Sequence, residues 1–141
     1  MNDIRIVEGK CPIFIFKVKN HHLIKNDILN SISAMGKYSV VTKLQSISNQ
    51  DWFIPSGVEK PYFSIIRPVI EDHTKVLGEI LNTDTIQLDN VWFQQYEKGD
   101  FHTWHVHSNC MFSNVYYVDL DDQNPKTSFR MFGQEIEVDV E

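Results

Sequence analysis

Apolar residues in the N-terminal half of the chain follow two different spacings. Residues 11–18 form an apolar run rich in β-branched and aromatic side chains, which predicts a buried strand. From residue 22 to residue 35 apolar side chains recur every three or four positions, which predicts an amphipathic helix. A second helix is predicted from Pro68 or Val69 to Leu81, because proline is favoured in the first turn of a helix.

Beyond residue 82 the spacing changes to the alternation that is typical of strands. Four strands are predicted, with polar turns between them: residues 85–95, 113–120, 127–132 and 134–141. The stretch between the two helices, residues 37–64, is predicted to be a loop with at most one strand. Helices that precede the strands, rather than alternate with them, indicate an α+β fold.

The composition is that of one globular domain. The chain has 141 residues, of which 42% are hydrophobic, enough for a buried core. Its 13 Lys and Arg against 19 Asp and Glu give a net charge of −6, which argues against nucleic-acid binding. No apolar stretch approaches the ~20 residues of a membrane span, and residues 1–10 lack the apolar core of a signal peptide. We therefore expect a cytoplasmic protein, without membrane association, in which Cys11 and Cys110 are reduced and buried.

The chemically informative segment is residues 96–109, which contains three of the six histidines: His102, His105 and His107. If residues 104–108 are extended, the two-residue period places His105 and His107 on one face, close enough to share a metal ion. Imidazole is a ligand of Fe, Zn, Cu and Ni. The alternative without a metal is a surface-exposed His-x-His on an edge strand. On the same pattern His102 lies on the opposite face, outside the set of metal ligands or in solvent.

Two metal-dependent families have sites of this kind. The first motif of the cupins begins Gly-x5-His-x-His, and Gly99, His105 and His107 have that spacing. The cupin motif continues with a glutamate after three or four further residues, where this chain has Met111 and Phe112. The similarity to the cupins therefore covers half of their motif.

A longer stretch, residues 91–120, resembles the Fe(II)/2-oxoglutarate dioxygenases, specifically the prolyl-4-hydroxylase-like branch. That branch has a tyrosine, a glycine-containing turn, the iron motif His-x-Asp and a strand that ends in Tyr-Tyr-Leu. The matching positions are Tyr96, Gly99, His105-Val106-His107 and Tyr116-Tyr117-Val118. The resemblance looks closest to small oxygenases of phages and marine bacteria, in which a second histidine can take the place of the aspartate. It implies a double-stranded β-helix (jelly roll) with N-terminal supporting helices.

The resemblance also implies roles for individual side chains. It makes His105 the first iron ligand and puts His107 in the place of the carboxylate ligand. Tyr117 would donate a hydrogen bond to the far carboxylate of 2-oxoglutarate, and Tyr96 would line the same pocket. The implied cofactors are Fe(II) and 2-oxoglutarate, and the implied reaction is hydroxylation of a peptidyl or small-molecule substrate. Packing in a half-buried strand is the simpler explanation of the tyrosines.

Downstream of His107 the chain departs from this family. The family's third ligand is a distal histidine, followed by an arginine or lysine that pairs with 2-oxoglutarate, but no histidine follows His107 here. The downstream cations are Lys126 and Arg130, and Arg130 is either a substitute carboxylate partner or a plain surface arginine. Asp100 as a substitute iron carboxylate would require its turn to fold back.

The final residues alternate polar and apolar side chains up to Glu141. Residues 85–141 hold about four to six strands, whereas a closed jelly roll has about eight. We therefore expect a single domain, 1–141, in which residues 1–84 support the first part of a jelly-roll core that is incomplete at the C-terminus. The open strand edge would pair with a second copy, giving a homo-oligomer, or promote aggregation. A catalytically inactive oxygenase-like binding or structural module, or a cupin-like metal protein, are the alternative functions.

Overall fold

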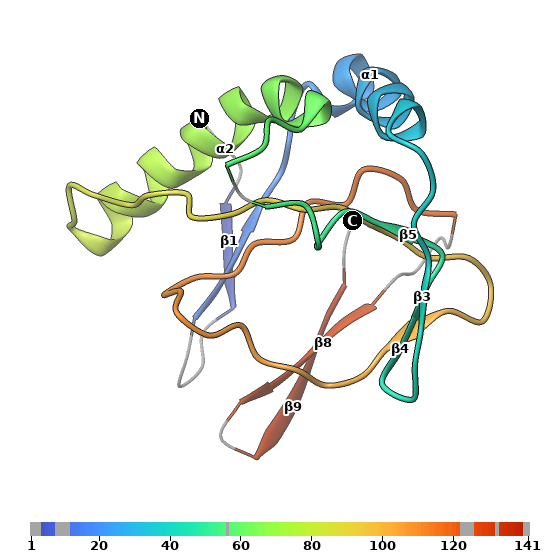
Figure 1. The fold of residues 1–141 in the computed structure, drawn as a ribbon. Coiled ribbons are helices and arrows are strands. Elements are labelled where there is room, and N and C mark those ends of the chain that lie inside the picture. Colours follow the sequence, from blue (N-terminus) through green and yellow to red (C-terminus); the bar gives the residue numbers. More distant parts are fainter. Residues whose placement is uncertain (1–3, 8–11, 56, 122–125, 132, 140–141) are drawn as a thin grey trace.

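The computed structural model describes residues 4–7, 12–55, 57–121, 126–131 and 133–139. In these ranges two helices, α1 (His21–Ala34) and α2 (Pro61–Leu81), lie together at one side of the molecule, and small antiparallel sheets lie on the other side (Figure 1). The strands are β1 (Ile4–Val7), β2 (Ile13–Phe16), β3 (Val40–Val41), β4 (Gln45–Ile47), β5 (Asn49–Gln50), β6 (Gln94–Gln95), β7 (Phe101–His102), β8 (Lys126–Met131) and β9 (Gln134–Asp139). Within the same ranges, neither helix combines the length and apolar character that would let it cross a lipid bilayer.

Helix α1 is the helix that the apolar spacing of residues 22–35 predicts, and this prediction is confirmed to within one residue at each end. Its residue Ile28 is 1% exposed and forms the centre of the core with Tyr62 and Ile66 of α2. The chain turns after the helix at Gly36, whose φ of +89° is a conformation that favours glycine. The core therefore lies between the two helices and the segments that pack beneath them.

Helix α2 begins at Pro61, so the predicted start at Pro68 or Val69 is wrong. The proline in the first turn is Pro61, which follows the extended residue Lys60 (φ −106°, ψ 119°). Pro68 lies inside the helix on its exposed side, where the carbonyl that loses its N–H partner can bind water. The earlier start is favoured because it carries Tyr62, 2% exposed, into the core.

The strands pair in small antiparallel groups: β1 with β2, β4 with β3 and β7, β5 with β6, and β8 with β9. The predicted strand at residues 11–18 is confirmed as β2, and the two predicted C-terminal strands are confirmed as the β8–β9 hairpin. Residues 11, 132, 140 and 141 of these predictions lie outside the described ranges. Residues 37–64 contain β3, β4 and β5, so the prediction of at most one strand is wrong. The groups are not joined into a jelly roll in the described ranges, and the double-stranded β-helix stays a prediction.

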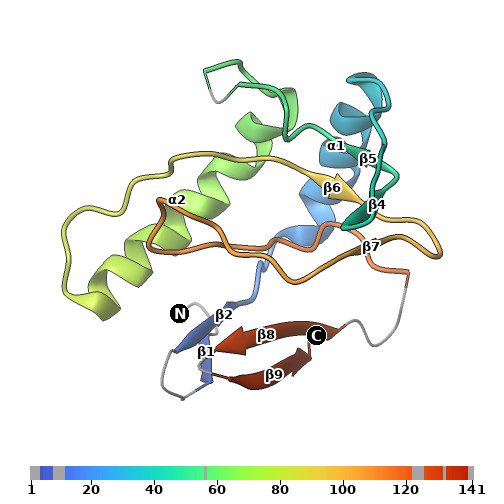
Figure 2. The same ribbon diagram turned by 60° about the horizontal axis from the view of Figure 1, so that its bottom comes forward.

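Two segments predicted to be strands are mostly irregular. Residues 85–95 contain only β6, and residues 113–120 contain no strand. Their alternation serves the core instead, since Phe93 and Tyr116 pack against the buried side chains of α1 and α2. Figure 2 shows the two segments, in yellow and orange, passing beside α2. Burial alone is enough to produce an alternating pattern, so such a pattern does not establish a hydrogen-bonded neighbour.

A buried polar cluster joins the start of α2 to the segments that form β5 and β6. Asp51 and Lys60 form an ion pair with 3.2 Å between Oδ2 and Nζ, and their side chains are 1% and 3% exposed. Asp51 also accepts hydrogen bonds from the Tyr62 hydroxyl at 2.7 Å and from the Phe93 N–H at 2.8 Å. Lys60 donates to the Val91 carbonyl at 2.6 Å. Burial, followed by the bond to Asp51, raises the pKa of Tyr62, so its hydroxyl stays a donor.

Candidate metal site

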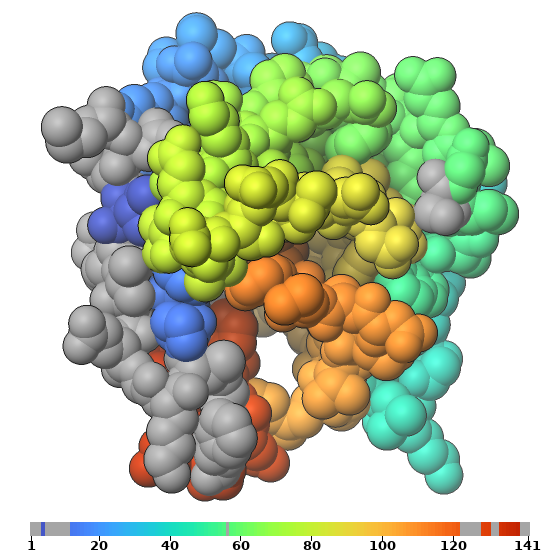
Figure 3. Space-filling model, turned by 90° about the vertical axis from the view of Figure 1, so that its left-hand side faces the viewer, coloured from blue at the N-terminus to red at the C-terminus, as the bar shows by residue number. Residues whose placement is uncertain are grey.

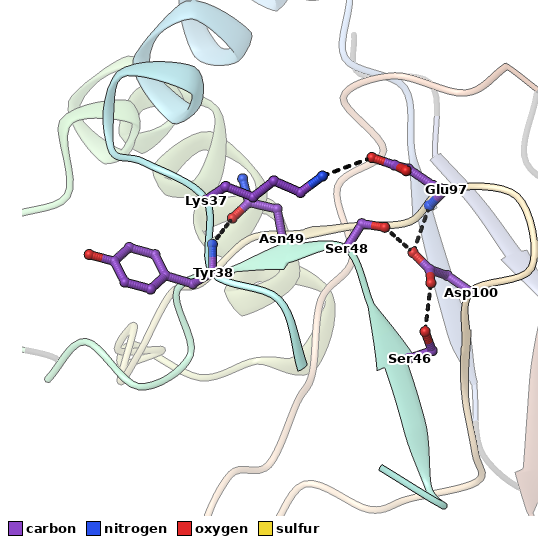
Figure 4. Close-up of polar contacts among 7 residues, drawn as sticks. All are labelled: Lys37, Tyr38, Ser46, Ser48, Asn49, Glu97 and Asp100. Atoms are coloured by element: carbon purple, nitrogen blue, oxygen red, sulfur yellow. Dashed lines mark hydrogen bonds and ion pairs between the residues drawn. The ribbon is translucent and has the colours of Figure 1, made fainter. Parts of the chain in front are cut away.

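Asp100 anchors the start of the histidine segment (Figure 4). Its carboxylate accepts hydrogen bonds from the Glu97 N–H at 2.8 Å, from Ser48 Oγ, and from Ser46 Oγ at 2.7 Å. These bonds stabilise the charged form and lower the pKa of Asp100 to about 2. Both carboxylate oxygens are thus engaged with β4, with Ser48 and with the turn before β7. The interpretation of Asp100 as an iron carboxylate therefore has no geometric support.

The segment that follows leaves its sheet before it reaches His105. Thr103 still donates its N–H to the Leu44 carbonyl at 3.0 Å, one residue beyond the pairing of β7 with β4. Residues 104–108 do not pair as a strand in the described structure. The rings of His105 and His107 nevertheless meet edge to face, with centroids 5.0 Å apart and planes at 79°.

His102 does not occupy the face that alternation predicts for it. Its ring stacks on that of His105, with centroids 3.9 Å apart and planes within 17°. The chain bends at Trp104, and this bend breaks the alternation between positions 102 and 105. The structure thus brings three imidazoles together, whereas the spacing predicts a pair.

Burial and hydrogen bonding act on different members of this group of imidazoles. His105 Nδ1 lies 2.9 Å from the carbonyl oxygen of Thr103. Because a carbonyl can only accept, Nδ1 carries a proton, and Nε2 is the nitrogen of His105 that could bind a metal ion. Burial lowers the pKa of His107, and the nearby His105 lowers it further. Burial also lowers the pKa of His102, with added effects of His105 and His107.

The three histidines meet only some of the requirements of a metal site. Neutral imidazole with a free nitrogen is the form that binds Fe(II), Zn, Cu or Ni. Across the described ranges, however, no group of three or more His, Cys, Asp or Glu side chains is placed to hold one ion. Stacking accounts for His102, because rings stacked face to face direct their nitrogens alongside one another rather than toward one point. The pair that remains as a candidate for holding a metal ion is His105 and His107.

Two tryptophans that sequence reasoning misses lie beside this pair. The ring centroid of Trp92 is 5.4 Å from that of His107, and Trp52 meets Trp92 edge to face at 4.6 Å. Trp92 lies in the alternating stretch 85–95, which signals partial burial but not this contact. Trp52 lies in a predicted loop, where no local pattern identifies it.

The two tyrosines assigned to the 2-oxoglutarate pocket have different surroundings. Tyr96 is 45% exposed, and its hydroxyl donates to Gln94 Oε1 at 2.9 Å. Tyr117 is half-buried, and burial raises its pKa. No hydrogen bond or ring contact joins either residue to the three histidines within the described part of the chain. Tyr116, in contrast, packs on the core and lies 2.8 Å from His21 Nδ1 through its hydroxyl.

The C-terminal hairpin approaches the histidine segment through Arg130. The Arg130 guanidinium lies 4.4 Å from the ring centroid of Trp104, the residue before His105, and 3.4 Å from Glu135 Oε2. Figure 3 shows an opening between the segment drawn in orange and the red C-terminal residues. Arg130 is exposed, as expected of a surface arginine, but it is also the described downstream cation that lies next to this segment.

Cys110 follows the histidines and is exposed with a free thiol, so the prediction that it is buried is wrong. Its Sγ lies 3.7 Å from the His107 carbonyl oxygen. The predicted strands around it are not formed, which leaves this part of the chain on the surface. Cys11 lies outside the described ranges.

Two hollows in the described surface lie along α2. A groove of about 750 Å³ runs between α2 and residues 86–91, and one of about 580 Å³ lies at the end of α2. Neither is lined by His102, His105 or His107.

Comparisons with known proteins find no match to this chain. No protein-family model matches the sequence, and neither the search of curated proteins nor that of solved structures returns a match. The case for a function therefore depends on the residues described above.

Proposed function

We propose that this chain is a metal-dependent oxygenase of the Fe(II)/2-oxoglutarate type, in which His105 and His107 hold the metal. One observation carries the proposal: the two rings lie 5.0 Å apart, and the Thr103 carbonyl binds Nδ1 of His105 and so leaves its Nε2 free. The resemblance of residues 91–120 to that family supports the choice of metal and co-substrate. When bound, Fe(II) and 2-oxoglutarate would supply the oxidising power to hydroxylate a peptidyl or small-molecule substrate.

The chain's own residues would orient and neutralise the ligands. The Thr103 carbonyl fixes the tautomer and the direction of the His105 ring, which is a common arrangement around metal ligands. Trp92 lies against one side of His107, and burial lowers the pKa of this imidazole. The Asp100 anchor holds the beginning of the segment against β4.

Two protein ligands leave the remaining positions of an iron ion to water and to the keto acid. Arg130 is our candidate partner for the keto-acid carboxylate, because it already lies against Trp104, next to His105. Tyr117 and Tyr96 stay predictions in this role. A jelly-roll fold, a cytoplasmic location and assembly through an open strand edge likewise remain proposals.

Metal binding is tested first, by isothermal titration of the purified protein with Co(II) and, without oxygen, with Fe(II). We expect stoichiometric binding that His105→Ala and His107→Ala each weaken at least about tenfold, which corresponds to about 1.4 kcal/mol. The matched control is His22→Ala, which removes an exposed histidine on α1 and should bind like the parent chain. Parent-like binding by both site variants would refute the site.

Turnover is tested separately, by measuring succinate from the Fe(II)-loaded protein supplied with 2-oxoglutarate and oxygen. Succinate above the level formed by His105→Ala supports the oxygenase. Stoichiometric metal binding without succinate would replace the proposal with a cupin-like metal protein. If neither metal binding nor succinate is observed, the chain is an inactive oxygenase-like module.

A further inference from the structure

Five aromatic rings form a continuous row that ends at the histidines. The row runs Trp52, Trp92, His107, His105 and His102, and neighbouring ring centroids are 4.6, 5.4, 5.0 and 3.9 Å apart. Contacts at these distances are those of packed aromatic pairs. The two tryptophans therefore extend the candidate metal site into a wall on one side of His107.

The pairing of β5 with β6 explains why the tryptophans are placed there. One residue beyond this ladder, Asp51 accepts the Phe93 N–H with its side chain, and both side chains face the core with Tyr62. The next residues, Trp52 and Trp92, meet edge to face. Trp52 lies in the turn that follows β5, which the Ile54 N–H closes on the Asp51 carbonyl at 3.0 Å. The two indoles thus lie next in sequence to the buried, hydrogen-bonded pair of Asp51 and Phe93.

The wall has the character of a site for an uncharged ring. Trp52 is 53% exposed, and neither indole forms a hydrogen bond or ion pair with the described residues. The net charge of −6 disfavours an anionic ligand. A metal ion on His107 would repel a cationic ligand, because Trp92 is in contact with that imidazole.

We propose that Trp52 and Trp92 form a substrate subsite that binds an uncharged aromatic ring and holds it next to His107. The inference rests on the proposed function, which supplies the metal at His107. The subsite itself is made of side chains that are in place without the metal. Aromatic stacking should favour an aromatic ring over a saturated ring of the same size by about 2- to 12-fold in affinity.

The experiment is a titration of the metal-free protein with p-cresol, followed by the indole N–H signals in a ¹H–¹⁵N NMR spectrum. The chain has three tryptophans, and Trp→Phe variants assign the three signals. We expect saturable shifts of the Trp52 and Trp92 signals. Trp104, which is 48% exposed and has Arg130 against its ring but no tryptophan partner, is the internal control and should shift less than Trp52. The saturated probe 4-methylcyclohexanol should bind about 2- to 12-fold more weakly.

Separate variants distinguish this inference from the proposed function. Trp52→Ala should abolish saturable p-cresol binding and leave Co(II) binding intact. His107→Ala should weaken Co(II) binding and leave saturable p-cresol binding in place. Equal affinities for the two probes, or a Trp104 shift as large as that of Trp52, would overturn the subsite. Should Trp52→Ala lose its dispersed spectrum, the pattern of shifts in the parent chain still decides. Failure of Co(II) binding alone would remove the metal centre and not the subsite.

Discussion

The Asp51–Lys60 ion pair gives the sharpest test of what holds the site in place. Asp51→Asn keeps the shape of the side chain but removes its charge. The Lys60 side chain, which is 3% exposed, then has no counter-ion for its ammonium group. Removing one partner of a buried pair typically costs about 3–5 kcal/mol. The new amide oxygen can still accept the Phe93 N–H, so we expect the lower half of this range, about 3–4 kcal/mol. That is a large share of the ~5–15 kcal/mol by which domains are stable.

The measurement is the free energy of unfolding from urea titrations, followed by circular dichroism and by tryptophan fluorescence. Asp51→Asn should lower the midpoint without changing the slope. The matched control is Glu97→Gln, which breaks a 3.1 Å pair with Lys37 whose side chains are 61% and 63% exposed. An exposed pair is worth at most about 1 kcal/mol, so this variant should unfold close to the parent.

The double variant Asp51→Asn/Lys60→Met closes the cycle. Removing both charges should restore part of the lost stability, because no uncompensated ion then remains in the core. If Asp51→Asn lowers the free energy of unfolding by less than about 1 kcal/mol, the reasoning is refuted, because a surface carboxylate in an ion pair contributes as much. If the double variant loses as much free energy of unfolding as Asp51→Asn and Lys60→Met lose separately and in sum, the two charges are not coupled.

The remaining predictions concern other contacts. The pKa of Asp100 is about 2, against a usual value of 3.8. The stability that its charged form contributes is therefore fully present above pH 3.8 and is lost as the pH falls through about 2. Over this pH range the urea midpoint of Asp100→Asn should change less than that of the parent. Gly78→Ala places a Cβ 2.9 Å from the Thr83 carbonyl oxygen and should cost about 1–3 kcal/mol by thermal unfolding, whereas Gly57→Ala, with open space around it, should not. Cu(II) should quench the tryptophan fluorescence stoichiometrically, and His107→Ala should reduce the quenching; unchanged quenching in that variant would place the metal away from His107.

Elements with a strong local pattern could be predicted from the sequence. Helix α1 repeats its apolar residues at one period along its length, and the β8–β9 hairpin alternates side chains around the turn at Gly133. Helix α2 shows where local signals stop being sufficient, because the prediction takes Pro68 as the first-turn proline whereas the helix begins at Pro61. Burial of Tyr62 decides between them, and burial depends on residues far along the chain.

In the candidate site, too, local contacts could be predicted from the sequence and long-range contacts could not. The proximity of His105 and His107 follows from two residues of spacing, so a local pattern can reveal it. His102 stacks on His105 across the bend at Trp104, and Trp92 precedes Phe93, whose N–H binds the Asp51 carboxylate 42 positions away. Polar contacts of this range leave no periodic trace in the sequence. If Asp51 does fix the wall beside His107, its loss should disturb the indole signal of Trp92 before the chain unfolds; an unchanged signal in folded Asp51→Asn would show that core packing alone positions the wall.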